Sequence, residues 1–179
     1  MDMAPEMFAE GTDPRLDPPP CGSEFETLMG FLDYQRQTLE AKCSGLDADA
    51  LASRSVPPSE LSLLGLVRHL SDVERFWVRC SLMGQDDAPL YWLDDGCDTD
   101  FDFPELDASG VQASFTAWKD EVVFSDAALG SEPLGRSVLV PLHGEVSVRW
   151  ILVHLIEEYS RHNGHADLLR ESIDGLVGE

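Results

Sequence analysis

Residues 154–171 read HLIEEYSRHNGHADLLRE, and this stretch holds three histidines and a glutamate at helical spacing. His154, Glu158, His162 and His165 stand at offsets of 0, 4, 8 and 11 residues. On a helix of 3.6 residues per turn, these offsets place all four side chains along one stripe. A helix that packs into a core normally gives this stripe to apolar side chains, so the imidazoles and the carboxylate require an explanation.

A divalent metal ion would explain them. Glu158 and His162 are one helical turn apart, a spacing at which both side chains can reach one ion. A further histidine, His69, lies in GLVRHLSDVERFW, near the edge of the apolar stripe of an earlier helix. Burying a carboxylate beside an imidazole costs several kcal/mol unless a cation or a full set of hydrogen bonds compensates it. We therefore predict that His69, Glu158 and His162 are metal ligands; the alternative is a metal-free Glu158–His162 pair that lines a polar groove.

Three protein ligands would leave at least one coordination position for water or substrate, as catalytic metal sites require. The donor set of two nitrogens and one oxygen favours Zn²⁺, although Ni²⁺, Mn²⁺ and Fe²⁺ accept the same donors. His154 and His165 extend the stripe by one turn on either side, and Asp72 follows the first histidine by three residues. We name His154, His165 and Asp72 as candidate catalytic residues that could carry protons or orient an imidazole.

Two arginines flank these helices and are candidate binding residues. Arg68 precedes His69 and Arg161 precedes His162, so either guanidinium could hold a carboxylate of a substrate or cofactor. The alternative is that both form ion pairs with the many acidic side chains of this chain.

Composition excludes several classes of protein. The chain has 179 residues, of which 43% are hydrophobic, and its net charge is −22. This charge has the wrong sign for binding nucleic acid or an anionic membrane. The four cysteines form no C-x-x-C pair, and the sequence has neither a signal peptide nor the roughly 20 apolar residues that span a bilayer. We expect a cytoplasmic protein with reduced thiols and a small-molecule substrate.

The sequence predicts a short N-terminal arm followed by one folded domain. Residues 1–22 are rich in Pro, Asp and Gly and indicate a flexible arm, while residues 23–179 form a single domain. The β-branched segments SVLVP and GEVSV flank Leu142-His143 and predict a hairpin. Four long amphipathic helices are expected: from Ser23, with Glu26 completing a capping box; from Pro58–Ser59 to Gly84; from Asp107 or Ser109 to about Gly130; and from Ser147 to about Ser172. This pattern describes an all-α bundle.

The connection over residues 86–107 is unusual, because it mixes many aspartates with aromatic side chains. It is either a loop that folds over the rest of the molecule or a solvated acidic connector.

The segments LVRHLSDVERFWVR and HLIEEYSRHNGHADLLRE resemble the DinB-like superfamily, most closely its branch of mycothiol-dependent enzymes. The resemblance covers residues 23–175, and the second segment is its specific part. It implies an up-up-down-down four-helix bundle, a homodimer and a three-ligand divalent metal site. The ligand set on His69, Glu158 and His162 is similar to the His, Glu, His set of mycothiol-dependent maleylpyruvate isomerases.

The resemblance implies a thiol S-transferase that uses a low-molecular-weight thiol such as mycothiol and a small electrophile. The chemistry agrees, because coordination to a dication deprotonates a thiol whose pKa is otherwise near 8.5. Two other functions stay open: a metalloenzyme of a biosynthetic pathway that hydrolyses or isomerises its substrate without a thiol, and a metal-binding stress protein without catalysis.

Overall fold

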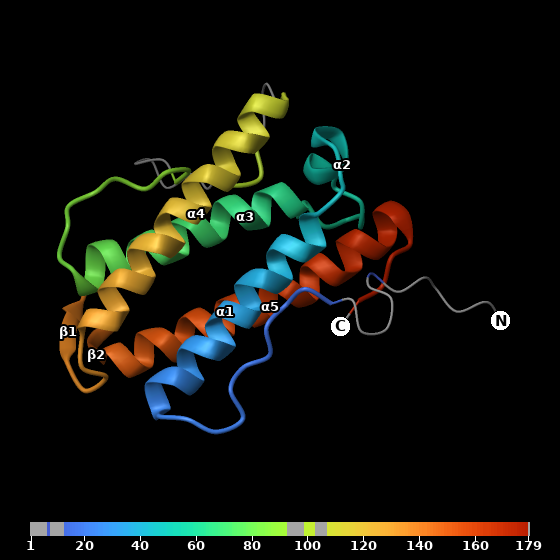
Figure 1. Ribbon diagram of the computed structural model, residues 1–179. Helices are drawn as coiled ribbons and strands as arrows, with labels where there is room; N and C mark the ends of the chain where they lie inside the picture. Colours follow the sequence, from blue (N-terminus) through green and yellow to red (C-terminus); the bar gives the residue numbers. More distant parts are fainter. Residues whose placement is uncertain (1–6, 8–12, 93–98, 103–106, 179) are drawn as a thin grey trace.

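The computed structural model describes residues 7, 13–92, 99–102 and 107–178. Their fold is an all-α bundle with one short hairpin before the last long helix, as the sequence predicted (Figure 1). The elements in chain order are α1 (Glu24–Cys43), α2 (Ala48–Ala52), α3 (Leu63–Glu74), the π-helix η1 (Arg75–Leu82), α4 (Ala108–Ser131), β1 (Ser137–Val140), β2 (Gly144–Ser147) and α5 (Val148–Asp174). None of the described helices combines the length and the apolar character that crossing a membrane requires.

Capping side chains set most of the helix boundaries. At the start of α1, Ser23 Oγ accepts from the Glu26 amide, and the Glu26 carboxylate accepts from the Ser23 amide, which confirms the predicted capping box. Asp107, rather than Ser109, caps α4. Ser147 caps α5, and Gly175, with φ of 80°, ends it in the left-handed conformation.

The second long helix differs from its prediction. It begins at Leu63, because Ser62 Oγ accepts from the Gly65 amide and so satisfies its first turn, and not at Pro58–Ser59. Its second half is the π-helix η1, in which hydrogen bonds such as Met83 N to Val78 O span five residues. The apolar repeat did not reveal this change of pitch, because both forms keep a buried stripe.

The order of helix directions also needs correction. In chain order the four long helices run up, down, down and up, and not up-up-down-down: Figure 1 shows α3 and α4 running opposite to α1 and α5. Helices α1 and α5 are parallel, because the residue numbers of their contacts rise together along both helices: Glu24–Arg149, Gln35–Asn163 and Lys42–Asp167. The long connection over residues 83–107 makes this order possible, because parallel neighbours need a segment that returns along the helix length. The short β1–β2 hairpin, by contrast, reverses the chain between α4 and α5.

A polar chain crosses the apolar core and takes one residue from each long helix. Arg36 Nε of α1 donates to Glu74 Oε1 of α3 at 2.8 Å, and the Tyr159 hydroxyl of α5 donates to the same oxygen at 3.0 Å. Trp118 Nε1 of α4 donates to the Tyr159 oxygen at 2.8 Å. All four side chains are buried among leucines, so these bonds fix how the four helices meet.

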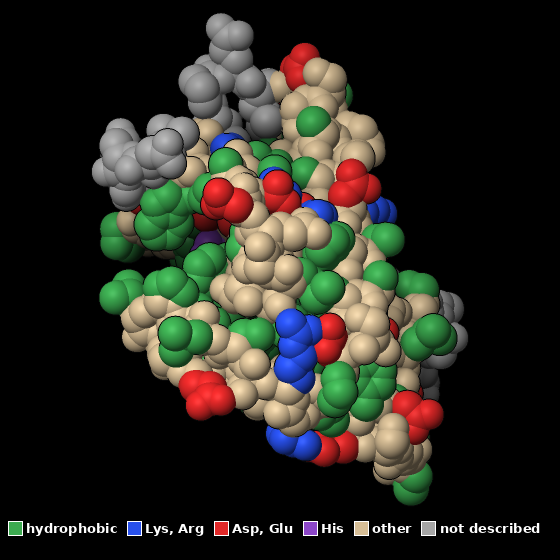
Figure 2. Space-filling view, turned by 90° about the vertical axis from the view of Figure 1, so that its left-hand side faces the viewer, with side chains coloured by type: hydrophobic (Ala, Val, Ile, Leu, Met, Phe, Trp, Pro, Cys, Tyr) green, Lys and Arg blue, Asp and Glu red, His purple; other side chains and the backbone are tan. Residues whose placement is uncertain are grey.

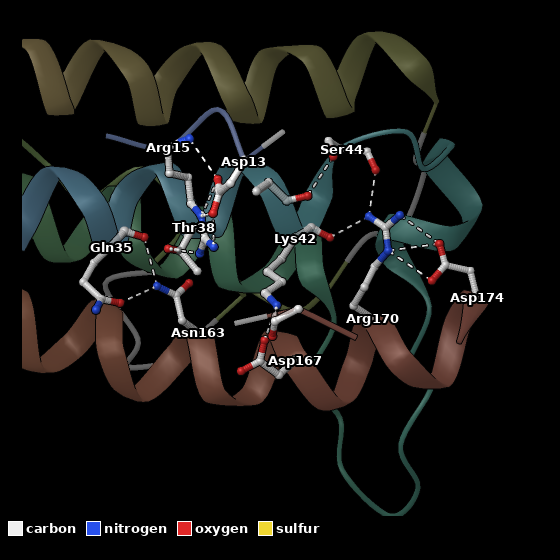
Figure 3. A network of polar contacts seen from close by, with 12 residues as sticks. Asp13, Arg15, Gln35, Thr38, Lys42, Ser44, Asn163, Asp167, Arg170 and Asp174 are labelled. Atoms are coloured by element: carbon white, nitrogen blue, oxygen red, sulfur yellow. Dashed lines mark hydrogen bonds and ion pairs between the residues drawn. The ribbon is translucent and has the colours of Figure 1, made fainter. Parts of the chain in front are cut away.

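A second polar network joins α1 to α5 (Figure 3). The Asn163 amide donates to the backbone oxygen and the side-chain oxygen of Gln35, at 2.9 and 2.7 Å. Buried Lys42 pairs with Asp167 at 2.5 Å. Asn163 and Asp167 of α5 therefore face α1. Because consecutive residues on a helix point about 100° apart, the histidine stripe of α5 lies on a different side of the helix and faces α3.

The described part of the N-terminal arm lies along α1. Arg15 donates to Thr38 Oγ1 at 3.1 Å, and the Leu16 amide donates to the Gln37 side chain at 3.0 Å. Pro19 packs so closely on Gly30 that a Cβ there would lie 2.4 Å from the proline Cδ. The arm therefore makes specific contacts with the bundle over residues 13–22.

The buried polar chain makes a prediction about stability. Replacing Glu74 with alanine removes the carboxylate that faces the buried Arg36 guanidinium, so we expect the free energy of unfolding to fall by about 3 kcal/mol. Urea denaturation followed by circular dichroism measures the loss. The matched control is Glu40→Ala, which breaks the exposed Glu40–Lys119 pair between α1 and α4 and should cost less than about 1 kcal/mol. Equal losses in the two variants would contradict the prediction.

Candidate metal centre

The structure brings together the three side chains that the sequence named as metal ligands. His69 comes from α3, and Glu158 and His162 come from α5; one donor atom of each lies within 4.8 Å of the others. Glu158 Oε2 is 3.8 Å from His69 Nε2 and 3.5 Å from His162 Nε2. The two imidazole rings are 4.7 Å apart between centroids. Thus two nitrogens and one oxygen converge on a single point between the helices.

A fourth residue, Asp100, fixes the orientation of His69. Its Oδ2 lies 3.1 Å from His69 Nδ1, and only 1% of the residue is exposed. A carboxylate at this distance selects the tautomer with the proton on Nδ1, which leaves the Nε2 lone pair directed at Glu158. Nothing in the sequence distinguishes Asp100 as a site residue, because it is one of many aspartates in the acidic segment 86–107. The part of that segment over residues 93–98 and 103–106 lies outside the described residues.

The charges of the centre favour an ionised carboxylate facing protonated imidazole. The facing ring of His162, and next that of His69, lower the pKa of Glu158 well below its usual range, against the opposing effect of burial. Burial by itself lowers the pKa of His69, but Asp100 and Glu158 outweigh it and raise this pKa to about 9. Without another cation, a proton on His69 is therefore favoured by the two acid groups that face this ring.

The two other histidines of the stripe adjoin the centre on opposite sides. His154 Nε2 is 3.7 Å from Glu158 Oε1, the oxygen that does not face His69. His165 Nδ1 is 3.3 Å from His162 Nδ1. Partial burial, and next the nearby His162, lower the pKa of His165. The predicted stripe is therefore continuous, with one histidine beyond each end of the candidate ligand pair on α5.

Asp72 and Arg68 contact the connection after η1. The Asp72 carboxylate accepts from the backbone amides of Leu90 and Tyr91, at 2.7 and 2.8 Å. The Arg68 guanidinium lies over the Tyr91 ring at 4.2 Å and donates to the Asp102 backbone oxygen at 3.0 Å. These contacts hold the described residues Leu90, Tyr91 and Asp102 against α3, which favours the alternative of a loop that folds over the molecule to that of a solvated connector.

Arg161 lies outside this group. Its guanidinium forms an ion pair with Glu157 one turn earlier on the exposed face of α5. This contact corresponds to the alternative of an ordinary surface ion pair, so the structure does not bring Arg161 to the converging donors.

The donor set suits a divalent ion such as Zn²⁺. Two imidazole nitrogens and a carboxylate oxygen are typical zinc ligands, and a carboxylate behind one imidazole is the usual support for a metal-bound histidine. Three ligands from two helices leave room for a further ligand, the arrangement of catalytic rather than structural zinc sites. His69, Glu158 and His162 are thus the residues that could hold the ion.

Most of the chain matches the model of one known protein family. The family model described as Mycothiol-S-transferase matches residues 27–175. The chain belongs to this family. The mycothiol S-transferases are part of the DinB-like superfamily, so the resemblance seen in the sequence is confirmed. A search of curated proteins gave no significant match.

Metal binding should depend on Glu158 and not on its neighbour. We predict that Glu158→Gln weakens zinc binding by at least about 100-fold, because the amide has lost the negative charge that faces both imidazoles. Competition with a zinc-binding dye measures the affinity. Glu157→Gln is the matched control: Glu157 is exposed and adjacent, and its loss should change the affinity less than about threefold. Equal affinities in wild type and Glu158→Gln would argue against a metal at this point.

Zinc affinity should also depend on pH. Below the pKa of His69, about 9, the ion must displace a proton, because imidazole binds metal in its neutral form. We expect affinity to rise by about tenfold per pH unit between pH 7 and 8.5 and to level off above about pH 9. Competition titrations corrected for protonation of the dye provide the test. In Asp100→Asn the plateau should begin at a lower pH, whereas a flat wild-type profile between pH 7 and 8.5 would contradict the expectation.

Proposed function

We propose that the protein is a divalent-metal-dependent S-transferase that joins mycothiol, or a closely similar low-molecular-weight thiol, to a small electrophile. Membership of the mycothiol S-transferase family supports the reaction class. The observation that carries the metal dependence is the convergence of His69, Glu158 and His162 on one point. We propose zinc as the metal, because it suits two nitrogens and one oxygen.

The metal would contribute one effect. When bound by His69, Glu158 and His162, a dication lowers the pKa of a neighbouring thiol from about 8.5 toward neutrality. Asp100 and His165 would act as positioning residues behind the ligands, since each lies within 3.3 Å of a ring nitrogen of one of them.

His154 is placed to take the proton of the thiol. Its Nδ1 lies 3.3 Å from Glu157 Oε2, so the carboxylate selects the tautomer in which Nε2 is free to accept. Nε2 lies 3.7 Å from Glu158 Oε1, and the other oxygen of the same carboxylate faces His69 and His162. In the proposed reaction the thiol gives its proton to His154, and the sulfur forms a bond to the electrophilic carbon. The leaving group departs with its bonding electrons, or an epoxide oxygen takes up the proton as the ring opens.

Asp72 and Arg68 would serve this reaction through the acidic segment. Both hold it against α3, and Asp100, on the same segment, contacts His69. We propose that they position this loop rather than touch the reacting atoms. The homodimer, the cytoplasmic location and the single domain over residues 23–179 stay predictions from the sequence.

The proposed function predicts a specific effect of His154. We expect zinc-loaded wild-type protein to convert mycothiol and an epoxide or alkyl halide to the thioether, followed by mass spectrometry. His154→Gln should reduce kcat by about 100-fold, because general-base catalysis contributes about 10²–10⁴-fold. Its zinc content should stay unchanged, because His154 is outside the predicted ligand set.

Two results would count against this proposal. Conjugation that proceeds equally well after removal of zinc would exclude the metal from the reaction. A complete lack of conjugate across epoxides, halides and activated alkenes would favour a metalloenzyme without a thiol or a metal-binding protein without catalysis. In the conjugation assay, Asp120→Asn, which changes an exposed residue of α4, serves as the control for effects of charge alone.

A further inference from the structure

Four aromatic side chains form a continuous cluster beside the candidate metal centre. We call Phe76, Trp77, His143 and Trp150 the aromatic wall; they come from η1, the hairpin turn and the first turn of α5. Trp77 is its centre, with ring centroids 5.1 Å from Phe76, 5.0 Å from His143 and 5.0 Å from Trp150. Two regions distant in sequence, η1 and the segment from the hairpin turn to the start of α5, therefore meet through their rings.

The wall is only partly covered by the protein itself. Trp77 is buried, but Phe76 is 45% exposed, Trp150 is 41% exposed and His143 is exposed as well. Large aromatic side chains gain most by removal from water, so a cluster that leaves them open suits a ligand that covers them. The π-helical pitch of η1 contributes here, because π-helical segments often occur where function requires an unusual side-chain arrangement.

The wall is continuous with the centre through His154. The Trp150 ring stacks on the His154 ring at 4.9 Å and 18°, and Trp77 meets the same ring edge-on at 4.7 Å. His154 in turn is 3.7 Å from Glu158. On the face that carries the hairpin, Figure 2 shows a histidine side chain in a recess between hydrophobic and acidic side chains. A ligand against the wall would thus lie next to the reacting groups.

The charges around the wall favour an uncharged ligand. The arginines of η1, Arg75 and Arg79, both pair with Glu121, and Arg161 pairs with Glu157. Arg79 also lies 3.9 Å from Asp87, so each of these guanidinium groups has an acidic partner, and the whole chain carries a net charge of −22. An anionic substrate would find no spare cation among these side chains, whereas a neutral aromatic ring needs none.

We propose that the aromatic wall binds the aromatic ring of an uncharged electrophilic co-substrate and so places its reactive carbon beside His154. This inference rests on the proposed function for the identity of the reaction, and it adds the class of the second substrate. Stacking on Trp150 and contact with Phe76 supply the binding, and the chemistry takes place at the adjoining metal centre.

The kinetic test compares two epoxides that differ by a phenyl group, styrene oxide and propylene oxide. Trp150→Ala should raise the KM for styrene oxide by at least tenfold and change the KM for propylene oxide and for mycothiol less than twofold. Trp150→Phe, which keeps a ring, should recover most of the loss. Phe31→Ala, a matched control at an exposed aromatic residue of α1, should change none of the three. Equal effects of Trp150→Ala on both epoxides, or an effect on mycothiol alone, would overturn the proposal.

A binding test separates this inference from the proposed function. Saturation-transfer NMR with the unreactive probe 1-phenylethanol should show contact with the zinc-loaded wild-type protein and little with Trp150→Ala. Phenylacetate, which adds a negative charge to the same ring, should bind more weakly than 1-phenylethanol. Loss of probe binding in Trp150→Ala supports the wall even if no thioether forms in any assay. Undiminished binding in that variant, or stronger binding of phenylacetate, would overturn it.

Discussion

The buried chain of hydrogen bonds from Arg36 through Glu74 and Tyr159 to Trp118 is the constraint on which the site depends. Each of the four long helices contributes one member, and an unpaired member would leave a polar group without solvent in the core. The chain therefore permits few alternative rotations or shifts of the helices. Tyr159 directly follows Glu158 on α5, and Glu74 lies on the same helix as His69. The bonds that hold the bundle thus also hold the converging donors in place.

The acidic connection after η1 takes part in the site as well as in the fold. Asp72 and Arg68 hold its two ends on α3, and its Asp100 contacts the ring of His69. A loop placed in this way links its own position to the orientation of the imidazole, because the hydrogen bond exists only while Asp100 stays buried. Among the aspartates of this segment that the structure describes, Asp100 therefore belongs to the centre.

Polar and apolar surfaces meet at His154. On one side its ring faces the Glu158 carboxylate, and on the other it stacks on Trp150. The proposed reaction needs both environments: charge where the thiol loses its proton, and an apolar surface on which a bound electrophile displaces water. The middle of α5 supplies the charged environment. The first turn of α5, together with η1 and the hairpin, supplies the apolar surface. His154 is the residue at which the proposed proton transfer and the proposed substrate binding adjoin.

The sequence by itself determined the features that depend on local chemistry. Capping at Ser23, the start of α5 at Ser147 and the stripe on α5 follow from interactions within about four residues, which is why they could be predicted. The pairing of that stripe with His69 was accessible only through the cost of burying Glu158 and through the family resemblance. The directions of the helices, the π-helical pitch of η1, the selection of Asp100 among many aspartates and the meeting of Trp77 with Trp150 depended on tertiary structure. Each of these is set by contacts between segments far apart in the chain, and no local pattern specifies which partner a side chain will meet.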